Sequence, residues 1–216
     1  MRTICRLTMV ILLSVWGWKT HAQFEGKIII KVEALDLPYD LEPYRSLIES
    51  ESILYIKGSK SRLETVMPGL ESSITITDTL TGKVLSCIES EGQKMAMESN
   101  YKEELLDASP YFQTSFTTLN GTKKIAGFNC KNGLYTITEG PSVSTMEIWY
   151  SPEIQNVQND APNVPGLIME MIMDEGDVKI RYAVSEVFQQ IVPDSFFMLP
   201  EGYILIEPSD TEEDDD

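Results

Sequence analysis

Histidine is almost absent from this 216-residue chain, and its one copy, His21, lies in an N-terminal segment that we expect to be removed. Ser-His-Asp and Cys-His sites need an imidazole to activate their nucleophile, so both are excluded in their usual form. Histidine-ligated zinc, copper and non-haem iron sites are excluded for the same reason. We therefore predict a protein that is not an enzyme, with no catalytic residue, no metal and no cofactor.

Positive charge is also scarce. The chain has 17 Lys and Arg residues against 34 Asp and Glu residues, and its formal net charge is −17. Such an acidic protein repels nucleic acids and anionic membrane surfaces. After residue 22, no apolar run reaches the roughly 20 residues of a transmembrane helix. We predict no nucleic-acid partner and no transmembrane segment in the mature chain.

The first 22 residues have the three parts of a secretory signal peptide. Arg2 and Arg6 supply positive charge, residues 7–18 are mostly apolar, and Ala22 offers a small residue before the expected cut at Gln23. Removal of this segment changes the formal charge to −20. We predict export to the periplasm; secretion or surface exposure would use the same signal, and a retained N-terminal anchor is the alternative.

Cysteine is rare as well. Cys5 lies in the predicted signal peptide, which leaves Cys87 and Cys130. In an oxidising compartment these two can form a disulfide, worth about 4 kcal/mol in the chain-entropy model. The alternative is a pair of buried apolar thiols on separate strands. The spacing alone does not distinguish the two.

Apolar residues recur with a period of two through most of the chain, which is typical of half-buried strands in an antiparallel sheet. Glycine-containing turn signals separate the segments, and Asn120-Gly121 and Asn132-Gly133 are the strongest hairpin signals because both residue types accept positive φ. The segments predicted as strands are 27–31, 53–57, 62–67, 74–77, 84–89, 94–98, 112–119, 123–128, 134–138, 145–150, 167–173 and 178–185.

Helix signals are few and short. Pro43 begins one segment, with Leu47 and Ile48 on a common face, and a second segment covers Tyr101–Ala108 before Pro110. Ser151-Pro152 resembles an N-cap followed by proline at the first helical position, and predicts a further turn or two of helix. We predict a signal peptide over 1–22, one domain over 23–206, and a disordered acidic tail over 207–216.

Methionines alternate with other residues in two of the predicted strands. Met169, Met171 and Met173 share one strand face, and Met95 and Met97 repeat the pattern. Flexible thioethers suit a surface that accepts varied apolar ligands, but they also fill gaps in an ordinary core. A third interpretation is copper(I) binding by thioethers, which lacks supporting His or Cys ligands here.

Trp149 is a further candidate, because an aromatic ring can line the same groove or simply pack in the core. The carboxylates give no comparable signal. A hydrolase that uses two carboxylates needs a pair across a cleft, and no pair among the 34 acids stands out. We predict a ligand-binding face made by Met169, Met171, Met173, Met95, Met97 and Trp149.

Five segments together resemble an exported Gram-negative family, domain of unknown function 4412. They are Phe24–Ile30, Tyr55–Arg62, Lys123–Cys130, Glu147–Tyr150 and Phe197–Tyr203. The resemblance implies a mainly β fold, in which a curved antiparallel sheet forms a half-barrel, as in periplasmic lipoprotein carriers, with short helices on the concave face. In such folds the concave face can hold acyl chains. The family implies no catalytic residues.

Two functions follow from these observations. The first is non-catalytic binding of an apolar or lipid-like ligand on the concave face of the half-barrel. The second is an envelope structural or protein-interaction module, whose concave face is filled by its own side chains. A space below about 300 Å³ would be too small for a typical ligand and would favour the second.

Overall fold

The computed structural model describes residues 23–66, 72–108, 112–158, 161, 163–174 and 176–206. The predicted signal peptide, 1–22, and the predicted acidic tail, 207–216, lie outside these ranges. Within them, no helix has both the length and the apolar character needed to cross a bilayer.

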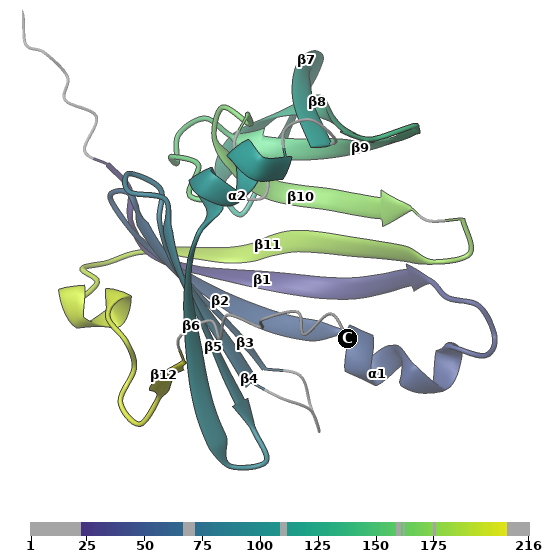
Figure 1. Ribbon diagram of the computed structural model, residues 1–216. Helices are drawn as coiled ribbons and strands as arrows, with labels where there is room; N and C mark the ends of the chain where they lie inside the picture. Colours follow the sequence, from purple (N-terminus) through teal and green to yellow (C-terminus); the bar gives the residue numbers. More distant parts are fainter. Residues whose placement is uncertain are drawn as a thin grey trace, which may run out of the picture.

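Twelve strands in the described ranges form one open, curved sheet (Figure 1), which confirms the predicted half-barrel class. The strand order is β12-β6-β5-β4-β3-β2-β1-β11-β10-β9-β8-β7, and every pair is antiparallel except the short parallel pair of β12 with β6. The strands are β1 (Glu25–Asp36), β2 (Ser50–Lys57), β3 (Lys60–Val66), β4 (Ser72–Asp78), β5 (Lys83–Ser90), β6 (Gln93–Asn100), β7 (Phe112–Ile125), β8 (Phe128–Glu139), β9 (Ser142–Ser151), β10 (Leu167–Asp174), β11 (Lys179–Gln189) and β12 (Ile204–Ile206).

Strand pairing defines the two faces of this sheet, because residues paired across neighbouring strands lie on the same face. The inner face carries a row of paired residues that runs from β1 to β6: Ile30, Ser52, Thr65, Ser73, Ile88 and Met95. The outer face carries a row that runs from β1 to β9: Lys31, Ala183, Glu170 and Trp149. The alternation in the sequence therefore corresponds to two different faces. Apolar and hydroxyl side chains lie on the inner face, and most charged side chains lie on the outer face.

The core lies mainly against the inner face. One buried cluster joins β1, β2, β10 and β11 through Ile28, Leu54, Met169 and Val184. A second cluster lies under β8, β9 and β10 and includes the buried Ile148. Burying these apolar side chains supplies the main favourable free energy of folding, at roughly 25 cal/mol per Å².

The two Asn-Gly hairpin predictions are wrong. Segment 112–119 and the first half of segment 123–128 are joined in one long strand, β7, which ends at Ile125. The hairpin to β8 is the two-residue turn Ala126-Gly127, with φ of 47° and 90°. Asn120-Gly121 lies at a register irregularity inside β7, where the Gly121 amide donates to Oδ1 of Asn132 at 2.7 Å. Gly133 lies inside β8, and glycine is needed at this position because a Cβ would collide with the Phe116 ring. These glycines serve close packing rather than turns.

The helices are as short as the sequence predicts. The Pro43 segment forms a 3₁₀ turn, η1 (Glu42–Tyr44), and then α1 (Arg45–Ile48), while α2 spans Tyr101–Ala108. The helix predicted at Ser151-Pro152 is wrong, because β9 ends there in a turn in which the Glu153 amide donates to Oγ of Ser151. One 3₁₀ turn, η2 (Asp194–Phe197), packs on the outer face, where Phe196 meets Tyr55 edge to face.

Candidate functional site

A cavity of about 490 Å³ opens on the inner face of the sheet, between β1, β2, β3, β10, β11 and α1. Its walls are mostly apolar, with a few hydroxyl groups and one amide. The lining residues are Ile30, Val32, Leu47, Ile48, Ser50, Ser52, Leu63, Thr65, Gln158, Ile168, Met169, Glu170, Met171, Tyr182, Ala183 and Val184.

Strand alternation explains why these side chains converge. Val32 is paired with Tyr182, and Tyr182 is paired with Met171, so all three project from the same face of three adjacent strands. The short helix α1 adds Leu47 and Ile48 to the wall beside them. The sequence indicated the apolar face of this helix, but it gave no sign that the helix would line the same cavity as the methionine strand.

Arg45 fixes α1 in this position. Its guanidinium bonds Glu42 at 2.8 Å and Glu49 at 3.3 Å, and it also donates to the Ala34 carbonyl at the end of β1. The hydrogen bond from Arg45 lowers the pKa of Glu42, and the same bond raises the pKa of Arg45. Arg45 is thereby paired with carboxylates on both sides of α1, and it is not among the residues that line the cavity.

A small polar patch interrupts the apolar wall. Oγ of Ser52 lies 2.9 Å from Oγ1 of Thr65, across the β2–β3 pair, and Ser50 is two residues further along β2. Gln158 also borders the cavity, and its Oε1 accepts a hydrogen bond from the Ile168 amide at 3.0 Å. The sequence analysis did not identify these residues as candidates. For Ser50 and Ser52 a signal was present, because both alternate along β2 on the same face as Leu54.

The predicted methionine face is only partly brought together. Met169 and Met171 line the cavity, and Met173 follows on the same strand face but is not among the lining residues. Met95 and Met97 also project from the inner face, and are 37% and 54% exposed. Neither of them is among the residues that line this cavity, so the expectation that Met95 and Met97 line the same groove is wrong.

Trp149 is on the other side of the sheet. It pairs with Glu170, whereas its neighbour Ile148 pairs with Met171 on the inner face. The ammonium group of Lys123 lies 4.3 Å from the centre of the Trp149 ring, a cation–π arrangement. The prediction that Trp149 lines the groove is therefore wrong, because a shift of one residue along a strand changes the face.

Glu170 is the most buried carboxylate described here, with 9% of its surface exposed. It accepts hydrogen bonds from Lys123 at 2.5 Å and from Arg181 at 2.8 Å, and Arg181 also bonds Glu33 at 2.9 Å. Burial raises the pKa of Glu170, but the hydrogen bonds from Lys123 and Arg181 outweigh burial, so its pKa is lowered overall. Although Glu170 borders the cavity, its carboxylate is thus held in an ion cluster on the outer face.

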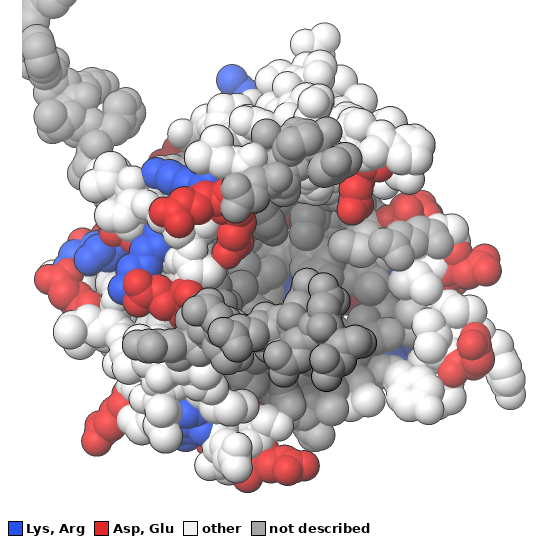
Figure 2. Space-filling model, in the orientation of Figure 1, with Lys and Arg blue, Asp and Glu red and all other residues white. Residues whose placement is uncertain are grey.

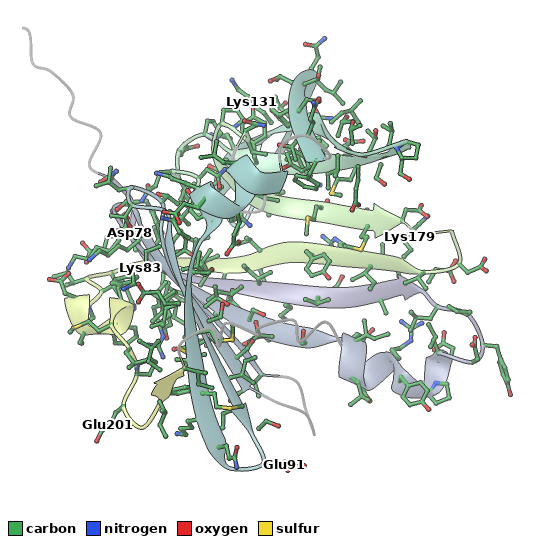
Figure 3. The ribbon with its side chains drawn as sticks, in the orientation of Figure 1. Asp78, Lys83, Glu91, Lys131, Lys179 and Glu201 are labelled. Atoms are coloured by element: carbon green, nitrogen blue, oxygen red, sulfur yellow. The ribbon has the colours of Figure 1, made fainter. Side chains whose placement is uncertain are left out.

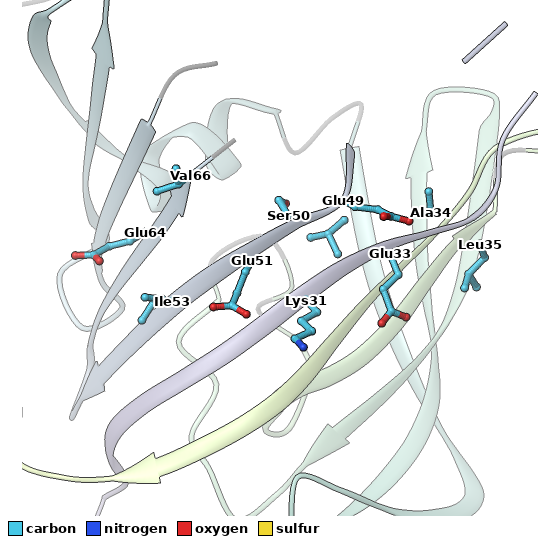
Figure 4. Close-up of a pocket in the computed structure, with 11 residues that line it drawn as sticks. Lys31, Glu33, Ala34, Leu35, Glu49, Ser50, Glu51, Ile53, Glu64 and Val66 are labelled. Atoms are coloured by element: carbon cyan, nitrogen blue, oxygen red, sulfur yellow. The ribbon is translucent and has the colours of Figure 1, made fainter. Parts of the chain in front are cut away.

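A larger but shallower depression, of about 850 Å³, lies on the outer face of β1, β2 and β3 (Figure 4). Lys31, Glu33 and Glu51 project into it from the same side of the strands. Its wall mixes apolar groups with these charges and is open to water. In the described ranges, this depression included, no three Cys, Asp or Glu side chains are grouped closely enough to hold a metal ion. The inner cavity is the better candidate site because it is more enclosed and more apolar.

Cys87 and Cys130 are free thiols, each only 1% exposed. Cys87 packs with Ile76 and Leu85 at one end of the sheet, whereas Cys130 belongs to the cluster around Ile28. Of the two alternatives that the sequence left open, the structure has the pair of buried thiols. Burial raises the pKa of both thiols.

Thiol titration checks this placement. For a chain that begins at Gln23, we expect two thiols to react with Ellman's reagent in guanidinium chloride, and both to react about 100-fold more slowly in the native protein, because they are buried and protonated. The titration is done without a reductant. Fewer than two thiols in the unfolded protein would show that the disulfide forms after all.

No family model and no curated protein matches the chain, so the resemblance to domain of unknown function 4412 stays a prediction. The solved structures that match the chain include two with known coverage and low sequence identity. One is a beta-barrel-like protein of domain of unknown function DUF1849 from Brucella abortus, with 9% identity, a TM-score of 0.41, and coverage of 78% of this chain and 99% of that one. The other is LprF from Mycobacterium bovis, with 10% identity, a TM-score of 0.32, and coverage of 78% and 88%.

Proposed function

We propose that this protein is an exported, non-catalytic binder of an apolar or lipid-like ligand, which it holds in the inner cavity. One observation carries the proposal: about 490 Å³ of space, walled by apolar side chains from β1, β3, β10, β11 and α1, with serines from β2. Ligand sites usually occupy about 300–1,000 Å³ and combine apolar walls with a few polar groups. The sequence of residues 1–22 supports a periplasmic location.

The competing function is an envelope structural or protein-interaction module with a filled inner face. That function predicts a space below about 300 Å³, because side chains would occupy the hollow. The observed cavity is larger, at about 490 Å³. The cavity volume therefore favours ligand binding over a filled core.

Mass spectrometry of the mature protein purified from a periplasm tests the proposal directly. We expect the native spectrum to contain a stoichiometric adduct whose mass matches a lipid in the organic extract of the same sample. A clean apo mass that stays unchanged after incubation with envelope lipids would contradict ligand binding. In that case the search would turn to protein partners.

The same measurement on two methionine variants tests the site. We expect Met171→Asp to lose about nine-tenths of the bound lipid, because a carboxylate in the cavity wall has no partner there. Met97→Asp makes the same chemical change on the same face but outside the cavity, and should keep the lipid. Equal retention by the two folded variants would place the ligand elsewhere.

A further inference from the structure

The cavity is polar at one place but carries no positive charge. Of the 17 Lys and Arg residues in the chain, three precede Gln23, and none of the other 14 lines the cavity. Figure 3 shows where some of them lie: Lys131 is near the upper edge, Lys179 is at the start of β11 on the right, and Lys83 is at the left. Figure 2, in the same orientation, shows Lys, Arg, Asp and Glu side chains at the left and lower edges of this face.

This absence of Lys and Arg also holds for the residues after Gln23 that lie beyond the described ranges. Segments 67–71, 109–111, 159–160, 207–216 and the single positions 162 and 175 contain no Lys or Arg, and they include Glu71, Asp160 and Glu175. No cation can therefore come to the cavity from these segments. The formal charge of −20 after signal removal further disfavours the approach of an anion.

Two arginines on elements that line the cavity are already paired with carboxylates. Arg45 on α1 is held by Glu42 and Glu49, and Arg181 is held by Glu33 and Glu170 on the outer face. A carboxylate or phosphate inside the cavity would have to leave water without gaining a counter-ion. That transfer is unfavourable by several kcal/mol for an unpaired charge.

The polar patch suits an uncharged group instead. Ser52 and Thr65 each carry one hydroxyl, which can donate one hydrogen bond and accept others. Tyr182 faces the same space from β11. A ligand hydroxyl or ester oxygen can therefore exchange hydrogen bonds here with no change in charge.

We propose that the ligand is a single-chain lipid whose end group is uncharged and hydrogen-bonding, such as a long-chain alcohol, and that fatty-acid anions are discriminated against. This inference rests on the proposed function. It names the ligand class by the chemistry of the cavity: apolar walls for the chain, hydroxyls of Ser52 and Thr65 for the end group, and no counter-ion for an anion.

Matched ligands test the inference. The mature protein is loaded with the uncharged fluorescent probe N-phenyl-1-naphthylamine, which is then displaced by 1-hexadecanol or by palmitate at pH 8. We expect 1-hexadecanol to bind at least about tenfold more tightly than palmitate, because only palmitate is charged. Palmitate binding of equal or greater strength would overturn the inference while leaving the proposed function intact. If neither the probe nor either lipid binds, the proposed function itself fails.

A pair of variants tests the role of the hydroxyls. The double variant Ser52→Ala, Thr65→Val should bind 1-hexadecanol about fivefold more weakly and hexadecane with unchanged affinity, because only the alcohol uses a hydrogen bond. The matched control is Ser86→Ala, Thr75→Val, a paired set on the same face outside the cavity, which should change neither affinity. Unchanged binding of 1-hexadecanol by the first variant would overturn the assignment.

Discussion

Replacement of Val32 by Trp is expected to weaken binding of N-phenyl-1-naphthylamine and 1-hexadecanol at least about 30-fold. Val32 projects from the inner face of β1 into the cavity, between Tyr182 on one side and Ser50 on the other. An indole there occupies much of the space that the ligand needs. Val32 is half-buried rather than fully enclosed, so the ring can turn toward the opening without overpacking the core.

Lys31→Trp is the matched control for this experiment. Lys31 immediately precedes Val32 on β1, but its side chain projects into the open depression on the outer face. The control therefore adds the same ring to the same strand and should leave both affinities within about twofold, since surface changes are usually small in effect. Circular dichroism and the urea midpoint establish that both variants fold. Equal binding by the two variants would contradict the assignment of the ligand to the inner cavity.

The strands could be predicted from the sequence because the period-two pattern records which face of the sheet each residue occupies. Segments such as 178–185 carry that pattern clearly, and β11 covers 179–189. The hairpin between β7 and β8 was missed because the turn uses Ala126, a residue with little preference for positive φ. Asn-Gly is a stronger turn signal, but the tertiary contacts of Asn132 and Phe116 require these residues inside the strands.

The candidate site was harder to predict, because alternation gives a face but not a position across the sheet. Met97 and Met171 both lie on the inner face, yet strand order separates them widely. Trp149 was placed on the wrong face because the register irregularity between Ile168 and Glu170 changes which residues of β10 lie opposite β9. The contribution of α1 depends on the contact of Arg45 with Ala34, which no local pattern encodes.

Replacement of Glu170 by Ala is expected to lower the free energy of unfolding by about 2–3 kcal/mol. Removal of one partner of a buried ion pair usually costs about 3–5 kcal/mol. The effect here should be somewhat smaller, because Lys123 and Arg181 are each about one-third exposed and can regain water. Glu33→Ala is the control: it removes only the exposed partner of Arg181 and should cost less than about 1 kcal/mol. Urea denaturation at pH 7 measures both, and equal losses would show that Glu170 has no special role.

The pH dependence of stability separates the charge of Glu170 from its packing. The pKa of Glu170 is lowered in the folded protein, so the folded state holds its proton less tightly than the unfolded state, where the pKa is about 4.3. The stabilisation is therefore complete above the unfolded pKa and is lost as the pH falls through the lower folded pKa. Glu170→Gln keeps the shape without the charge, so the difference in unfolding free energy between wild type and this variant should shrink from pH 6 to pH 3. A difference in unfolding free energy that stays constant from pH 6 to pH 3 would contradict this prediction. It would show that Glu170 stabilises the outer face by packing rather than by its hydrogen bonds to Lys123 and Arg181.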